Sequence, residues 1–212
     1  IDNFDGVQKF HSSPTPRIGG VSIFISFFIC IYLIGNNYKT FQFLIFISVL
    51  PAFLIGVFED IKRNINPNYR LLATFLSGFL FIMLTGYHIK ELDIYLIDNI
   101  LSIYVFSLIL TCFAISGVIN AINIIDGFHG LASGSLIIMF ASFAMIGWYT
   151  EDYLINNLAI ISILIYAGFF ILNFPFGFIF LGDSGAYFGG FLLSALAIML
   201  PYRNPEISSW VS

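Results

Sequence analysis

Charged residues are scarce in this sequence. Asp, Glu, Lys and Arg together make up 9% of its 212 residues, whereas apolar residues make up 59%. Soluble domains carry about a quarter charged residues, so a chain this apolar would not keep its surface in water. The composition therefore excludes a soluble globular protein and predicts a polytopic membrane protein.

Cysteine is rare as well. Cys30 and Cys112 are the two cysteines, and each lies inside an apolar run. Cysteines placed in this way predict neither a disulfide framework nor a metal cluster. The GDSG of residues 182–185 also occurs around the nucleophile of trypsin-like serine proteases. A protease is excluded because the sequence offers Ser184 no catalytic base and predicts no soluble fold.

Long apolar runs are abundant instead. A run of about 17 to 25 residues spans a bilayer as a helix, since each residue rises about 1.5 Å through a core about 30 Å thick. Membrane strands would alternate apolar and polar residues, which these runs do not. The fold class is therefore all-α, a polytopic transmembrane helical bundle with about seven spans. The predicted spans are Ile18–Ile34, Phe41–Phe58, Leu71–Thr85, Ile100–Ile119, Leu131–Tyr149, Leu158–Phe174 and Ala186–Leu200.

Seven spans place the connecting segments alternately on the two sides of the membrane. One side receives segments 1–17, 59–70, 120–130 and 173–185, and the other receives 35–40, 86–99, 150–157 and the tail. Five of the eight basic residues fall on the first side, so the positive-inside rule predicts that this side faces the cytoplasm. These five are Lys9, Arg17, Lys62, Arg63 and Arg70.

Four polar segments reach this predicted cytoplasmic side. They are KFHSSPTPRIGG (9–20), GVFEDIKRNINPNYRL (56–71), NAINIIDGFHGLASG (120–134) and FLGDSGAYFGG (180–190). A carboxylate at the end of a membrane helix is costly unless it is paired or bound to a metal. Mg²⁺ prefers one or two protein carboxylates, waters and phosphate oxygens. The acidic residues of these segments, with nearby Lys and Arg, therefore predict chemistry on phosphate.

Each segment alone is also compatible with a purely structural role. The charged run 59–63 is typical of a solvated loop, Asp126 of a helix cap, His129 of an interfacial residue, and the glycines of 180–190 of helix packing. A transporter would carry its carboxylates within the spans, whereas these lie at span ends. A structural membrane protein stays an alternative, but it does not account for four polar segments on one side.

In this order, from Lys9 to about Gly190, the four segments resemble the polyprenyl-phosphate N-acetylhexosamine-1-phosphate transferase family, glycosyltransferase family 4. The resemblance implies a Mg²⁺-dependent enzyme of the bacterial cytoplasmic membrane, with its active site facing the cytoplasm. Such an enzyme transfers a sugar-1-phosphate from a UDP-sugar to undecaprenyl phosphate and releases UMP, as the initiating membrane step of cell-wall or surface polysaccharide synthesis. N-acetylglucosamine or a related acetamido sugar is the expected donor sugar. The phospho-N-acetylmuramoyl-pentapeptide transfer of peptidoglycan synthesis is the alternative.

The resemblance also implies roles for individual residues. Glu59 and Asp60 match the acidic pair at the reacting phosphates, and Asp126 matches an acidic position of the nucleotide-sugar site. Asp183 and Asn123 match the Mg²⁺ ligands, with Mn²⁺ as an alternative ion. The residues that match substrate-binding positions are Lys9, His11, Arg63, Asn120 and His129. Asp60 as general base and Asp60 as orienting residue both stay open, and direct attack is preferred to an aspartyl-phosphate intermediate.

Three departures from the family pattern bear on these expectations. Glu59 stands where the acidic pair usually has an Asp, and His129 stands where a second Asp is common. A later loop rich in His and Arg has no counterpart before Ser212. We therefore expect a single membrane transferase domain over residues 1–212 that is truncated at both ends. A homodimer stays open, and no nucleic-acid partner is expected.

Overall fold

The computed structural model describes residues 15–34 and 39–207, and within these ranges the chain forms eight helices and no strand. The predicted all-α class is therefore confirmed. The helices are α1 (Gly19–Ile34), α2 (Lys39–Lys62), α3 (Pro67–Thr85), α4 (Tyr95–Leu101), α5 (Tyr104–Ile125), α6 (Leu131–Tyr149), α7 (Tyr153–Asn173) and α8 (Gly182–Arg203).

Six of the described helices are long and apolar enough to cross a membrane, and α1 is a shorter apolar helix. The short helix α4 was not predicted. It lies where the sequence suggested a connection followed by a span from Ile100. The predicted start of that span was wrong, because residues 100 and 101 belong to α4 and α5 begins at Tyr104.

Several helices also extend beyond their apolar runs into segments predicted as connections. This holds at the C-terminal ends of α2, α5 and α8 and at the N-terminal ends of α2, α3, α7 and α8. The backbone hydrogen bonds of a helix do not require apolar side chains, so polar residues continue it where it leaves the hydrocarbon. At the start of α3, Pro67 suits the first turn, and the Asn66 side chain accepts the backbone N–H of Asn68 (2.9 Å).

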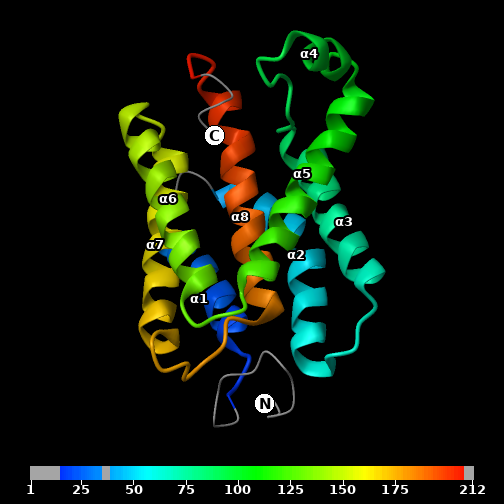
Figure 1. Cartoon of the computed structure of the whole chain (residues 1–212). Helices are drawn as coiled ribbons and strands as arrows, with labels where there is room; N and C mark the ends of the chain where they lie inside the picture. The colour runs from blue at the N-terminus through cyan, green and yellow to red at the C-terminus, as the bar shows by residue number, and fades with distance from the viewer. Residues whose placement is uncertain (1–14, 35–38, 208–212) are drawn as a thin grey trace.

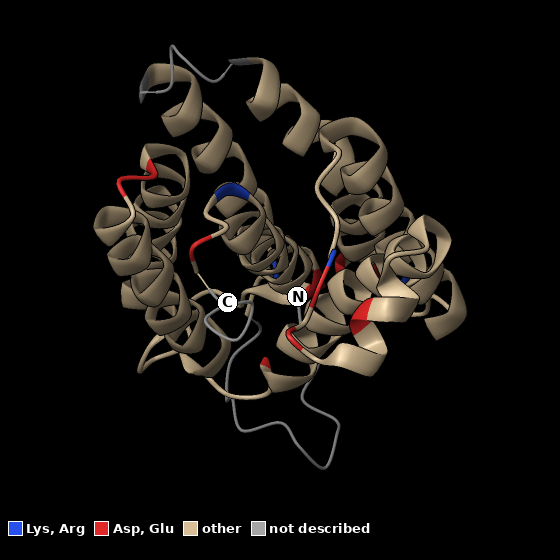
Figure 2. Cartoon of the chain, turned by 90° about the horizontal axis from the view of Figure 1, so that it is seen from above, with Lys and Arg blue, Asp and Glu red and all other residues tan. Residues whose placement is uncertain are grey.

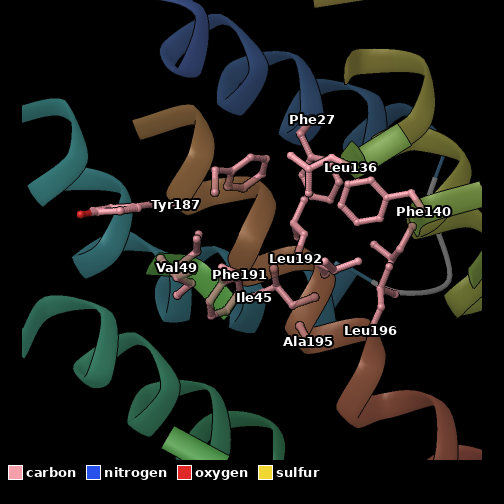
Figure 3. Close-up of a cluster of buried hydrophobic side chains, with 14 of the residues drawn as sticks. Phe27, Ile45, Val49, Leu136, Phe140, Tyr187, Phe191, Leu192, Ala195 and Leu196 are labelled. Carbon is pink, nitrogen blue, oxygen red and sulfur yellow. The ribbon is translucent and has the colours of Figure 1, made fainter. Parts of the chain in front are cut away.

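The central helix of the bundle is α8. The other long helices surround it (Figure 1), and almost every side chain between Gly182 and Leu200 is buried. Seen along the bundle, the ribbon carries few charged positions (Figure 2). Aromatic side chains fill the space around α8: the ring centroids of Phe27 and Phe188 lie 5.2 Å apart, and those of Phe81 and Phe191 lie 5.9 Å apart. Figure 3 shows part of this core.

Small residues bring α1 and α2 close to the first turn of α8. A β-carbon on Gly56 of α2 would lie 2.6 Å from the Cα atom of Ser184, and one on Gly20 of α1 would overlap the backbone nitrogen of Gly185. The backbone N–H of Gly20 also donates to the carbonyl of Leu181 (3.0 Å). Small residues allow this approach between membrane helices. The C-terminal end of α2 therefore lies directly beside the N-terminus of α8.

The described parts of the four polar segments gather at one end of the bundle, which we call the site end. In Figure 1 this is the lower end, where α2, α5 and α7 finish and α3, α6 and α8 begin. Backbone contacts join the segments: the N–H of Phe180 donates to the carbonyl of Pro16 (3.0 Å). The N–H of Gly130 also donates to the side chain of Asn173 (2.5 Å). Which side of the membrane this end faces stays a prediction.

Candidate active site

Asp60, in the last turn of α2, binds the N-terminus of α8. One carboxylate oxygen accepts the backbone N–H of Asp183 (2.8 Å). The other accepts the backbone N–H (3.0 Å) and the hydroxyl (2.6 Å) of Ser184. The first N–H groups of a helix have no partner within the helix, and the helix dipole favours an anion there. Asp60 therefore fixes the first turn of α8, and with it the position of Asp183.

Gly182 makes this contact sterically feasible. Its φ is +74°, in the left-handed region that favours glycine. A β-carbon at this position would lie 2.6 Å from a carboxylate oxygen of Asp60. The glycine before the aspartate in the GDSG segment thus serves the approach of α2 to α8. Helix packing therefore explains Gly182 of the GDSG segment, and no protease chemistry is needed to explain it.

Asp183 and Glu59 share one arginine. The Nη1 atom of Arg70, in the first turn of α3, donates to Asp183 Oδ2 (2.8 Å) and lies 3.8 Å from Glu59 Oε1. The other oxygen of Glu59 accepts the backbone N–H of Ile65 (2.9 Å), which fixes that carboxylate. The three charged side chains are half-buried, at 14% to 25% exposure. Two carboxylates from α2 and α8 therefore converge on one guanidinium.

Asn123, in the last turn of α5, also faces Asp183. Its side-chain nitrogen lies 3.4 Å from Asp183 Oδ2. Asn120 lies one turn earlier and points between α5 and α3, where its amide donates to the Ser116 carbonyl (2.8 Å) and the Thr74 hydroxyl (3.3 Å). The structure thus brings Asn123 to the carboxylates and uses the donors of Asn120 between helices. A substrate-binding role for Asn120 stays a prediction.

Asp126 follows α5 directly and is its C-terminal cap residue. Burial, and to a smaller extent the negative charge of Asp183, raise the pKa of this carboxyl to about 8, although the charge of Arg17 opposes the rise. Asp126 is therefore mostly protonated at neutral pH. The raised pKa follows mainly from burial, and the nearby charges of Asp183 and Asp60 add to it.

Four acidic side chains thus converge at the site end, and the positive charges that act on them include those of Arg70 and Arg17. We refer to this group as the site cluster. Its members are Glu59, Asp60, Arg70, Asn123, Asp126 and Asp183. A cluster with excess negative charge beside a helix N-terminus can bind a cation and, through that cation and the arginines, a phosphate group.

Asp183 and Asn123 were predicted to bind Mg²⁺. In the described part of the chain, no three His, Cys, Asp or Glu side chains lie close enough together to hold a metal ion. Mg²⁺ does not need such a set, because it binds one or two carboxylates and keeps waters and phosphate oxygens. The 3.4 Å between the Asn123 amide and Asp183 Oδ2 suits two ligands at about 2.1 Å from one ion, once the amide is turned to present its oxygen. The donor set therefore fits Mg²⁺, and equally Mn²⁺.

Two further predicted site residues, His129 and Arg63, lie in the loops that follow α5 and α2. His129 packs against the connection between α7 and α8, with its ring 5.3 Å from that of Phe180 and its Nδ1 3.4 Å from the carbonyl of Pro175. Arg63 follows α2 in a left-handed conformation (φ 55°), and its backbone N–H donates to the Glu59 carbonyl (2.8 Å). Their substrate-binding roles stay predictions. Lys9 and His11 lie outside the described residues.

Two members of this arrangement were not predicted as site residues. Arg70 was counted among the basic residues of the polar segments but was given no role of its own. Ser184 was treated as a neighbour of a metal ligand, whereas its hydroxyl binds Asp60. Neither contact has a sequence signal, because the pairs Arg70–Asp183 and Asp60–Ser184 lie 113 and 124 residues apart in the chain.

Comparison with known proteins gives a consistent result. Residues 42–201 match the model of the family described as glycosyl transferase family 4. The chain is 28% identical over 204 residues to a probable undecaprenyl-phosphate N-acetylglucosaminyl 1-phosphate transferase of Bacillus subtilis (strain 168), which covers 96% of this chain and 56% of that protein.

Two further relatives are phospho-N-acetylmuramoyl-pentapeptide-transferases. The protein of Streptococcus pneumoniae (strain CGSP14) is 29% identical over 208 residues, covering 92% of this chain and 63% of that protein. The protein of Enterococcus hirae is 30% identical over 210 residues, covering 91% and 64%. The chain therefore spans between 56% and 64% of the length of these three relatives.

Proposed function

Because the chain belongs to glycosyl transferase family 4, we propose that the protein transfers a sugar-1-phosphate from a UDP-sugar to undecaprenyl phosphate and releases UMP. It is an integral membrane protein, as its apolar helices and its bacterial relatives indicate. The observation that carries the proposal is the site cluster. Residues from α2, α3, α5 and α8 meet at the first turn of α8, with Asp183 contacted by both Arg70 and Asn123.

The reaction joins two anions. An oxygen of the lipid phosphate attacks the β-phosphorus of the UDP-sugar, the bond from that phosphorus to the bridging oxygen breaks, and UMP leaves with the electron pair. Charge repulsion between the reactants is the main obstacle. A divalent cation bound by Asp183 and Asn123 would supply positive charge to the phosphoryl oxygens. Arg70 adds a second positive charge to the same site.

Asp60 has a different role in this proposal. Both of its oxygens accept hydrogen bonds from the first turn of α8, so three of the about four lone-pair sites of the carboxylate hold that helix. This arrangement supports a positioning role over a role as general base or as the nucleophile of an aspartyl-phosphate intermediate. Direct attack by the lipid phosphate is the mechanism that we propose.

The preferred donor carries N-acetylglucosamine or a related acetamido sugar. The name and the 96% coverage of the Bacillus subtilis relative support this choice. The named pneumococcal relative supports the second candidate, the transfer of phospho-N-acetylmuramoyl-pentapeptide. We further propose that the site end faces the cytoplasm, because the basic residues predicted on its side outnumber those on the other.

The test uses the full-length protein in detergent with Mg²⁺, undecaprenyl phosphate and a panel of UDP-sugars that includes UDP-N-acetylglucosamine and UDP-N-acetylmuramoyl-pentapeptide. Release of UMP is measured with each donor. We expect UMP only when lipid phosphate and Mg²⁺ are both present, and the donor that yields it decides between the two candidates. Absence of UMP with every donor would contradict the proposed reaction.

A further inference from the structure

We propose that Arg70 is an exchangeable counter-ion, which pairs with Asp183 until a divalent cation binds there and then transfers to Glu59. The inference rests on the proposed function, because it concerns the same cation site. It assigns Arg70 a positioning role that sets how tightly the site binds its cation. It also assigns Glu59 the role of receiving the displaced arginine.

The first observation is that Arg70 and the proposed cation compete for one oxygen. Asp183 Oδ2 accepts from Arg70 Nη1 at 2.8 Å, and the same oxygen is the one that faces the Asn123 amide at 3.4 Å. An ion between Asp183 and Asn123 would therefore lie close to the guanidinium. Two cations at such a distance repel each other strongly in a half-buried site, so the arginine has to move.

The second observation is that, in the part of the chain that the structure describes, Arg70 is held at a single point. Nη1 makes both of its carboxylate contacts, whereas its Nε is buried and has no hydrogen-bond partner within the described residues. Arg203, at the other end of the bundle, pairs with Asp152 at two points, through Nε (2.6 Å) and Nη2 (3.0 Å). Two-point pairing fixes a guanidinium more firmly than one contact does. Arg70 is thus the more easily displaced of the two.

The third observation is that a second acceptor is already in place. Glu59 Oε1 lies 3.8 Å from the same Nη1 atom, and Glu59 is fixed because its other oxygen accepts the Ile65 N–H at 2.9 Å. A small movement of the guanidinium therefore exchanges Asp183 for Glu59. The positive charge stays in the site after the exchange, where it faces the phosphates of the proposed donor.

The experiment measures Mn²⁺ affinity of the full-length protein in detergent by electron paramagnetic resonance, without substrates. Arg70→Gln removes the competing charge, and we expect it to bind Mn²⁺ about tenfold more tightly than the wild type. Glu59→Gln removes the second acceptor, so binding should weaken about fivefold. The double variant has no arginine at position 70 that would need an acceptor, so its affinity for Mn²⁺ should equal that of Arg70→Gln.

Controls separate the exchange from other effects. Lys62→Gln removes a charge from the same end of the bundle, at the end of α2, and should change the affinity less than about twofold. Arg70→Lys keeps the charge and should stay near the wild type. If Arg70→Gln does not fold, the Mn²⁺ affinity of Glu59→Gln, which keeps Arg70, still tests the exchange. Glu59→Asp retains a carboxylate acceptor and is the matched control.

Three results would overturn the inference. If Arg70→Gln binds Mn²⁺ no more tightly than the wild type, Arg70 does not compete with the ion. If the double variant binds Mn²⁺ as weakly as Glu59→Gln does, Glu59 binds the ion itself. In both cases, loss of Mn²⁺ binding in Asp183→Asn would leave the proposed cation site intact. If Asp183→Asn binds Mn²⁺ as well as the wild type does, the cation site of the proposed function fails together with the exchange.

Discussion

The two ends of the bundle both place an aspartate beside an arginine, and the two pairs differ in how completely they are satisfied. At the end opposite the site, Asp152 pairs with Arg203 at two points (2.6 and 3.0 Å) and receives the Asn204 amide (3.3 Å). It also accepts the backbone N–H groups of Leu154 and Ile155 at the start of α7. We call Asp152, Arg203 and Asn204 the Asp152 clamp.

At the site end the charged side chains are less completely paired. Arg70 contacts both Asp183 and Glu59 through one nitrogen, and Asp126 lies nearby with a pKa raised to about 8, mainly by burial. In the Asp152 clamp, burial also tends to raise the pKa of the carboxyl, but the hydrogen bond and charge of Arg203 lower it below the ordinary value. A clamp that satisfies its own charges stabilises the fold, whereas a cluster with unbalanced charge is suited to bind a ligand.

The largest expected difference between the two ends is in turnover. Asp183→Asn removes the carboxylate that we propose binds the cation, and UMP release by the full-length protein should fall about 10³-fold or more. The melting temperature should change by less than about 3 °C, because one contact with Arg70 is lost. Asp152→Asn, the matched change in the clamp, should leave turnover per folded molecule unchanged. Full turnover in folded Asp183→Asn would contradict the division of roles.

The next largest effect is on stability, at the opposite end. Asp152→Ala leaves Arg203 without its partner and α7 without its cap, so the free energy of unfolding should fall by about 3 kcal/mol. The exposed Glu206→Ala at the same end is the control and should change it by less than about 0.5 kcal/mol. Thermal unfolding in detergent measures both. A clamp variant as stable as the wild type would show that the pairing does not hold α7 to α8.

Asp60 should combine the two behaviours, because it belongs to the site cluster but acts as a cap. Asp60→Asn turns an amide N–H₂ toward the donors of α8 and should cost about 2 kcal/mol of stability. Turnover should fall as well, because Asp183 loses its fixed position. Ser184→Ala, which removes one of the three hydrogen bonds, should have about half this effect on stability. Loss of turnover at unchanged stability would instead support a direct chemical role for Asp60.

The smallest effect is a pH dependence of opposite sign at the two ends. The folded pKa of Asp126, about 8, lies above its unfolded value. Its contribution to stability is therefore complete below about pH 4 and lost as the pH rises to about 8. Asp126→Asn should melt about 3 °C higher than the wild type at about pH 8.5, with a smaller gap at about pH 5.5.

The pKa of Asp152 is lowered, so the contribution of the clamp is present above about pH 4 and is lost on further acidification. The stability gap between the wild type and Asp152→Asn should therefore close as the pH falls. Melting curves of both variants across this range provide the measurement. A gap with the same sign of pH dependence at both ends would contradict the contrast between them.

The sequence predicted the spans well where apolar runs and helices coincide. Residues 131–149 form α6 with the predicted ends, and α1 begins one residue later than predicted. Apolar length did not predict α4 or the polar turns at the ends of α2, α5 and α8. Helix continuation there depends on caps and on neighbouring helices, as the contact of Asp60 with the start of α8 shows.

The site was predicted in outline and not in detail. Alternation of the spans placed the described polar segments at one end, and the resemblance of their motifs led to Asp183 and Asn123. The sequence did not show that Arg70 binds Asp183 or that Asp60 binds α8, because these contacts depend on how closely helices approach. Gly56 and Gly182 allow that approach, but glycine is common throughout membrane helices and by itself does not indicate which helix lies against it.

The most direct test of the cation site is a structure of the full-length protein with Mn²⁺, in which the anomalous scattering of the ion fixes its position. We predict one anomalous peak about 2.1 Å from an oxygen of Asp183 and from the side-chain oxygen of Asn123, with Arg70 moved toward Glu59. A peak at Asp60 or elsewhere, or no peak at the first turn of α8, would contradict the account.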